Sequence, residues 1–185
     1  MKQSKYINDY ALEERVDSRG RIRREAVYCG SFYAFRRQGA ELKKTKLLFT
    51  VLTVLALGAW LGAMLTNAPI VHCWYVLTPM SAMVFPVYYV LASCLRLLTA
   101  KEPLTREEND KIGGRFASSA IFLLIFSAIS LAGSIIFVIQ YQRYYSEEFS
   151  AANLAFPAAA LVLALCGWLL LSRKKELETL RVENP

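Results

Sequence analysis

Acidic and basic residues are absent from three long stretches of this 185-residue chain, although they make up 20% of it. The uncharged stretches are residues 47–95, 116–142 and 149–172. A bilayer core about 30 Å thick is crossed by about 20 helical residues. The last two stretches are each long enough for one crossing, and the first is long enough for two. The chain is therefore expected to contact the lipid bilayer. We expect no nucleic-acid partner despite the net charge of +7, because the charge is confined to the segments between and around these stretches.

The chain has one histidine, and its four cysteines are far apart in the sequence. The one histidine, His72, lies beside Cys73, and the other cysteines are Cys29, Cys94 and Cys166. No CxxC occurs, which excludes the four-helix, quinone-linked thiol oxidoreductases, and there is no HExxH and no nucleotide-binding glycine loop. Neighbouring side chains such as His72 and Cys73 converge poorly on one ion. We therefore expect no metal site, no cofactor and no enzymatic activity.

The fold class indicated is an all-α integral membrane protein, a four-transmembrane-helix bundle. The turn-forming residues Thr66-Asn67-Ala68-Pro69 divide the first uncharged stretch, because asparagine and proline favour turns and proline interrupts helices. The predicted spans are residues 47–66, 71–98, 117–139 and 153–172. They form one bundle over residues 47–172, preceded by a basic segment, 1–46, and followed by a tail, 173–185.

The basic residues indicate the orientation. Lysine and arginine in short loops remain on the cytoplasmic side of a membrane. With these spans, 21 of the 22 basic residues fall on the side that holds both termini, and Arg143 is the exception. We therefore predict a multi-pass protein of the cell membrane with both termini in the cytoplasm.

The segment 1–46 has two alternative structures. Asp17-Ser18-Arg19-Gly20 favours a turn, and the flanking residues favour a small β-hairpin. An interfacial helix is the alternative. Either would place aromatic residues near Phe35 against the membrane, with Arg36 and Arg37 at lipid phosphates. Arg96, at the inner end of the second span, would reach phosphates in the same way. The simpler alternative is that the basic cluster only fixes the topology.

Two further cytoplasmic segments are predicted to be helical. Thr105 and Glu108 have the spacing of a capping box, so a short surface helix is expected from there to the Gly113-Gly114 pair. The stretch 173–182 is expected to continue the fourth helix, with Lys174 and Glu178 as an i,i+4 ion pair.

Small residues four apart lie in the first predicted span. Gly58 and Gly62 form a GxxxG pattern, and Ala59 and Ala63 repeat it one residue later. Small residues let membrane helices approach closely. This face is predicted to pack within the bundle, and homodimerisation through it is the alternative.

Two prolines, Pro79 and Pro86, fall within the second predicted span, so that helix should be kinked or locally broken. Such breaks can mark transport sites, but proline is also ordinary in membrane helices. The residues beyond the kink give this helix the most polar face. The possible cavity lining is Pro86, Tyr88, Tyr89 and Ser93.

Three functional hypotheses follow. The first is a non-enzymatic accessory or scaffolding subunit that binds itself or a larger membrane protein. The second is a small oligomeric transporter or channel for a neutral or lipophilic solute, since no charged residue falls in mid-membrane to couple protons. The third is an interfacial lipid-modifying enzyme that would use Arg96, Glu107, Glu108 and Asp110.

Overall fold

The computed structural model describes residues 5–16, 22–144 and 151–182. The described part is mostly helical, and four of its helical segments are long and apolar enough to cross a membrane. Four is also the number of spans predicted from the uncharged stretches. The candidate spans are Gly39–Leu65, Trp74–Thr99, Arg106–Tyr141 and Ala152–Ser172.

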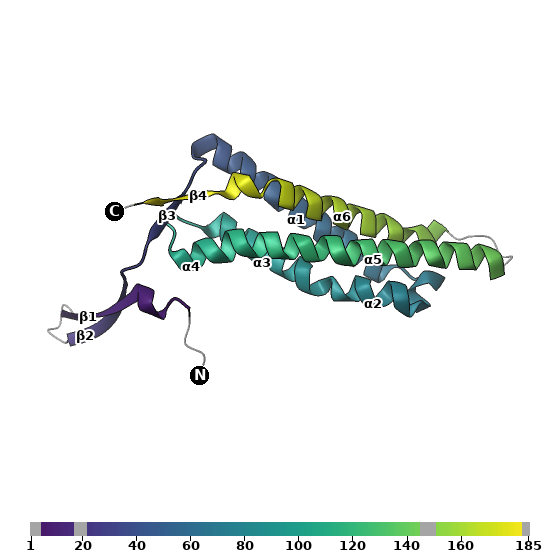
Figure 1. Cartoon of the computed structure of the whole chain (residues 1–185), viewed down its shortest axis with the longest axis horizontal. Coiled ribbons are helices and arrows are strands. Elements are labelled where there is room, and N and C mark those ends of the chain that lie inside the picture. The colour runs from purple at the N-terminus through teal and green to yellow at the C-terminus, as the bar shows by residue number, and fades with distance from the viewer. Residues whose placement is uncertain (1–4, 17–21, 145–150, 183–185) are drawn as a thin grey trace.

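The spans lie side by side along the long axis of the molecule (Figure 1). Helix α5 (Arg115–Tyr144) packs against α6 (Ala155–Ser172) and against both halves of the second span, and α1 (Gly39–Leu65) packs against α6. Large apolar side chains fill the interior: the rings of Phe49 and Phe116, both buried, lie 5.1 Å apart. Other apolar residues along the spans face outwards, as contact with lipid requires.

The second span is broken, as its prolines predict. It consists of α2 (Trp74–Ala82) and α3 (Val84–Thr99), separated at Met83. A break leaves backbone carbonyls without their helical donors, and α1 supplies one replacement. The indole Nε1 of Trp60 donates a hydrogen bond to the Met80 carbonyl over 2.9 Å. The neighbouring helix thus stabilises the break.

The predicted capping box is confirmed. The Thr105 hydroxyl accepts from the Glu108 backbone N–H, and the Glu108 carboxylate accepts from the Thr105 backbone N–H. This box begins α4 (Arg106–Asn109), which continues through a π-helical turn, η3 (Asp110–Gly114), directly into α5. The predicted surface helix is therefore the first part of the third span rather than a separate element.

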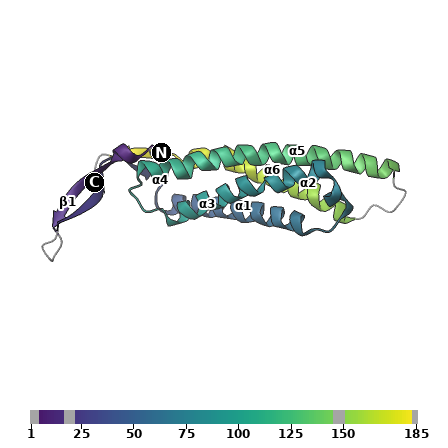
Figure 2. The same cartoon turned by 90° about the horizontal axis from the view of Figure 1, so that it is seen from below.

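The N-terminal segment forms the β-hairpin that was one of the two alternatives. After a short 3-10 turn, η1 (Ile7–Asp9), strands β1 (Tyr10–Val16) and β2 (Ile22–Tyr28) pair antiparallel. The predicted turn at residues 17–20 lies outside the described residues. The hairpin extends beyond the ends of the helices in both views (Figures 1 and 2).

The prediction that the tail continues the fourth helix is wrong. Helix α6 ends at Ser172, and a 3-10 turn, η5 (Lys174–Leu177), leads into strand β4 (Thr179–Val182). Strand β4 pairs antiparallel with β3 (Phe32–Phe35), which satisfies backbone groups through a segment distant in the sequence. Glu178 accordingly pairs with Arg36, at 3.3 Å, rather than with Lys174.

This second sheet brings both terminal segments to the same end of the bundle, called here the basic end (Figure 1). Leu104 adds a third backbone segment, because Tyr33 and Leu104 exchange hydrogen bonds of 2.8 and 2.7 Å. Strands β3 and β4 together with the residues around Leu104 form a collar over the ends of α1, α3 and α6.

Candidate functional site

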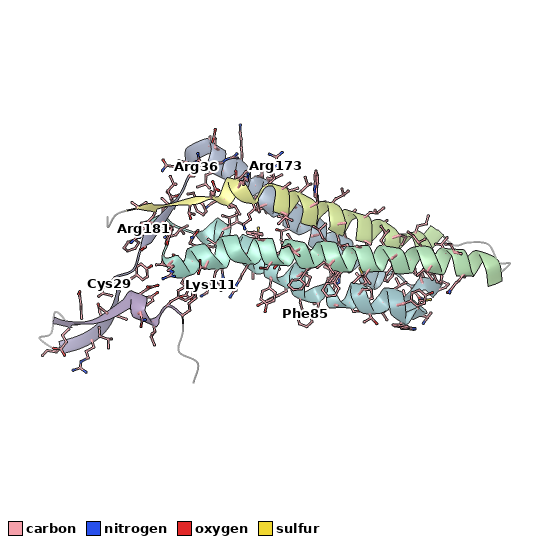
Figure 3. The ribbon with its side chains drawn as sticks, viewed as in Figure 1. Cys29, Arg36, Phe85, Lys111, Arg173 and Arg181 are labelled. Atoms are coloured by element: carbon pink, nitrogen blue, oxygen red, sulfur yellow. The ribbon has the colours of Figure 1, made fainter. Side chains whose placement is uncertain are left out.

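A groove of about 830 Å³ runs along the outside of the bundle between α3 and α5. Its apolar wall comes from both helices, and its polar end is closed by residues of the N-terminal segment at the basic end. Phe85 projects outwards from α3 on this side of the molecule (Figure 3). The lining residues are Lys5, Tyr6, Phe85, Pro86, Tyr89, Asp110, Gly114, Arg115, Ser118, Ser119, Phe122 and Phe126.

The polar end of the groove has one carboxylate and two cations. The Asp110 carboxylate accepts hydrogen bonds from Lys5 Nζ and from the Tyr6 hydroxyl, each over 2.9 Å. The Arg115 guanidinium lies over the Tyr89 ring, 5.9 Å from its centroid. Arg115 has no carboxylate partner among the described residues, so it carries an uncompensated positive charge at the mouth of the groove.

The residues predicted to line a cavity divide between two environments. Pro86 and Tyr89 lie in the wall of the groove. Tyr88 is exposed and its ring meets that of Tyr89 edge to face, at 5.5 Å. Ser93 is buried between helices, and its hydroxyl donates to the Lys111 carbonyl over 3.4 Å. Tyr88 and Ser93 are not among the lining residues of the groove.

The arginines predicted to contact lipid phosphates also differ from one another. Arg36 pairs with Glu178, and Arg37 pairs with Glu176 at 2.9 Å. Figure 3 shows Arg36 and Arg173 at the basic end, where the collar meets the helices. Arg96 is exposed and forms no ion pair with any residue that the structure describes. Contact with a lipid phosphate stays a prediction for all three arginines. At Arg36 and Arg37 a phosphate would compete with a carboxylate of the chain, and at Arg96 it would compete with no described ion-pair partner.

Glu176, in the turn η5 that leads into β4, has several partners. It accepts hydrogen bonds from Arg173 and Thr45, over 2.8 and 3.3 Å, besides its ion pair with Arg37. These interactions keep the pKa of the Glu176 carboxyl below its ordinary value, with the Arg173 hydrogen bond contributing most. The tail is thereby attached to the start of α1.

The GxxxG face of α1 is open. A Cβ atom at Gly58 or Gly62 would meet nothing within 4 Å, while Ala59 is half-buried and Ala63 is buried. The two glycines therefore make no close helix contact within the chain. The predicted packing within the bundle is thus not seen at Gly58 and Gly62, and homodimerisation, the alternative, stays a prediction.

The close contacts between helices are at two glycines that sequence patterns did not single out. A Cβ at Gly133 of α5 would stand 2.9 Å from the carbonyl oxygen of Tyr75, and one at Gly167 of α6 would stand 3.1 Å from that of Ala120. In neither place does a second glycine four residues away mark the contact.

A smaller polar hollow, of about 420 Å³, brings together three of the four residues considered for lipid-modifying chemistry. Arg96, Glu107 and Glu108 all line it. Both carboxylates, however, have local partners: Glu107 pairs with Lys111, and Glu108 caps α4. Their geometry is accounted for by helix formation.

No cluster of three or more histidine, cysteine, aspartate or glutamate residues that could hold a metal ion occurs in the described part of the chain. His72 lies exposed in the 3-10 turn η2 (Pro69–His72). Comparison with known proteins adds no functional assignment. The chain matches no protein-family model, no curated protein and no solved structure. Any function must therefore be argued from the surfaces of the molecule itself.

The β1–β2 hairpin presents one exposed apolar surface. Tyr10, Leu12 and Ile22 lie on one face with 41%, 74% and 67% of their area exposed. The charges on that face neutralise each other, because Arg24 and Glu14 form an ion pair at 3.1 Å. The face is therefore apolar with little net charge.

The base of the hairpin is held firmly. The Tyr28 ring packs edge to face against Tyr10 and Phe32, at 5.3 and 5.0 Å. The Tyr28 hydroxyl donates to the Ser31 carbonyl and accepts from the backbone N–H of Arg106, the first residue of α4. The hairpin is thus attached directly to the start of the third span.

Proposed function

We propose that this protein is a non-enzymatic accessory or scaffolding subunit of a larger membrane assembly. Both termini would lie in the cytoplasm, because 21 of the 22 basic residues belong to the sequence segments on the side of the spans that holds them. The β1–β2 hairpin would be the part that docks on a partner. The observation that carries this proposal is the uncovered apolar face of an anchored hairpin.

Energetics support a docking role. An isolated two-stranded hairpin is marginally stable in water, because each strand has one unpaired edge and one uncovered face. Exposed apolar surface of this kind marks interaction sites. Leu12 and Ile22 are each about two-thirds exposed or more and have no covering element.

The position of the hairpin favours a protein over lipid as its partner. The hairpin extends beyond the helix ends rather than along the sides of the spans (Figure 2). An incoming strand could pair with either edge, with apolar side chains covering the Leu12 face, which is the usual mode of β-augmentation. We therefore propose the soluble part of a membrane protein as the partner.

The transporter and enzyme hypotheses have less support. The lining of the groove extends from the basic end to residues near the middle of the second and third spans, Phe85 and Phe126. A transport path would need a second copy to continue it. Of the acids considered for catalysis, Glu107 and Glu108 pair or cap within the helix that carries them, and Asp110 is bound by Lys5 and Tyr6.

Site-specific photocrosslinking in native membranes tests the docking role. A photoreactive residue at Leu12 should give one discrete crosslinked product, and one at Glu13 should not, because neighbouring strand residues point to opposite faces. The double variant Leu12→Asp/Ile22→Asp should migrate in mild detergent as the lone 20.9 kDa chain, unlike the native protein. If the native protein also migrates alone and gives no crosslink, the proposal fails.

A further inference from the structure

The length of the groove between α3 and α5 matches one leaflet of a bilayer. Its α5 wall runs from Arg115 to Phe126, which at 1.5 Å per residue is about 17 Å. Half of a bilayer core about 30 Å thick is about 15 Å. Phe85 and Pro86, at the far end of the α3 wall, lie near the middle of the second span. The groove therefore reaches from the polar boundary to the bilayer midplane.

The walls along this length suit a hydrocarbon chain. Phe85 and Phe122 are exposed at 67% and 53%, although both face the groove. The rings of Phe122 and Phe126 stack, with centroids 6.3 Å apart. Three phenylalanines of the lining thus provide apolar surface that a flexible acyl chain can cover by dispersion contacts.

The polar end of the groove favours an anion. Asp110 is engaged by Lys5 and Tyr6, and Arg115 is the cation there that no described carboxylate neutralises. Gly114 leaves space beside it, since a Cβ at that residue would meet nothing within 4 Å. A guanidinium matches the geometry of a phosphate and binds it through two parallel hydrogen bonds.

We propose that this groove binds one anionic, phosphate-bearing membrane lipid from the leaflet at the basic end. Its phosphate contacts Arg115, and one acyl chain lies against Phe122, Phe126 and Phe85. A free phosphate would leave the aromatic wall uncovered, so a lipid is the source of the anion that fits both parts. The proposal uses no residue of the β1–β2 hairpin and is independent of the docking role.

Photolabelling in vesicles tests the site. The purified full-length protein is reconstituted in phosphatidylcholine vesicles in which a small fraction of phosphatidylglycerol carries a photoactivatable group on its acyl chain. Labelled peptides are then mapped by mass spectrometry. We expect labelling to concentrate on the peptides that contain Phe85 and Phe122, and unlabelled phosphatidylglycerol to compete for it.

Two pairs of variants separate the headgroup from the chain. Arg115→Gln should lower labelling of the groove about fivefold, the equivalent of about 1 kcal/mol for one cation near a lipid surface. Arg96→Gln removes the same charge from the same end of the bundle but lies outside the groove, and should change the labelling little. Ser118→Trp fills the groove and should reduce labelling as strongly, whereas Ala132→Trp, on the exposed surface of the same helix, should not.

Several results would overturn the proposal. Even labelling of all lipid-facing helices would show non-selective annular lipid. Equal labelling by a diacylglycerol with the same chains would exclude a role for the phosphate, and competition by inorganic phosphate alone would identify a free anion as the ligand. Equal losses in Arg115→Gln and Arg96→Gln would show general attraction to the surface.

Discussion

Gly133→Ala should destabilise the bundle, because α2 and α5 are in close backbone contact at this residue. The added methyl group would stand 2.9 Å from the Tyr75 carbonyl oxygen, closer than the 3.3–3.6 Å typical of carbon–oxygen contacts. That oxygen belongs to a backbone and cannot rotate away. In a continuous helix its donor would be the N–H of residue 79, which is a proline and has none.

The expected cost follows from this geometry. One helix must shift by several tenths of an ångström, and overpacking of this kind costs about 1–3 kcal/mol. At Gly167 the nearest backbone atom is 3.1 Å away and the others belong to leucine side chains. Gly167→Ala should therefore cost less, about 1 kcal/mol.

Gly58→Ala is the matched control, because a Cβ there meets nothing within 4 Å. It should leave the free energy of unfolding unchanged or slightly higher, since alanine favours helix over glycine. The variants are unfolded with SDS in mixed micelles at low protein concentration and followed by circular dichroism. Equal midpoints for Gly133→Ala and Gly58→Ala would refute the reasoning.

Three further predictions test other contacts. Trp60→Phe loses the hydrogen bond across the helix break and should lower the free energy of unfolding by about 1 kcal/mol, whereas Trp168→Phe, at an exposed residue, should not; identical SDS midpoints would contradict this. The partners that lower the pKa of Glu176 stabilise the fold at pH values above 4.5, the ordinary pKa of a glutamate. That stabilisation is lost as the pH falls through the folded-state pKa. Acidification below about pH 4.5 should thus lower the unfolding temperature of the native protein more than that of Glu176→Gln, and parallel curves would exclude the effect. A membrane-impermeant maleimide added to intact cells should label Cys73 but not Cys29, and the opposite pattern would reverse the proposed orientation.

The spans could be predicted because lipid imposes a length and excludes charge. The uncharged stretches correspond to four candidate spans, and Pro79 and Pro86 predicted a break that lies between them, at Met83. The capping box of Thr105 and Glu108 could also be predicted, because both partners lie within four residues. Each of these features depends only on residues close together in the sequence and on the surrounding lipid.

The tail could not be predicted in this way, because its structure depends on a distant segment. Lys174 and Glu178 have the spacing of a helical ion pair, yet Thr179–Val182 becomes a strand because Phe32–Phe35 offers it backbone partners. The groove has the same origin. Arg115 and Phe122 were visible in the sequence, but only the packing of α3 against α5 brings Phe85 beside them.

The GxxxG pattern shows how composition and packing can diverge. Gly58 and Gly62 carry the motif and face open space, whereas Gly133 and Gly167 carry no such motif and make the close contacts. A glycine pair permits close approach but does not require it. At Gly133 the approach is explained instead by the opposite helix, where Pro79 removes the regular donor of the Tyr75 carbonyl.

The two proposed surfaces share one anchor in the third span. Lys5 and Tyr6 bind Asp110 at the mouth of the groove, while Asp9 lies 3.9 Å from Arg106 beside the base of the hairpin. Five consecutive residues, 5–9, thus connect the groove to the hairpin across α4 and the π-helical turn. The orientation of the hairpin therefore depends on the same short helical segment that supplies the charged end of the groove.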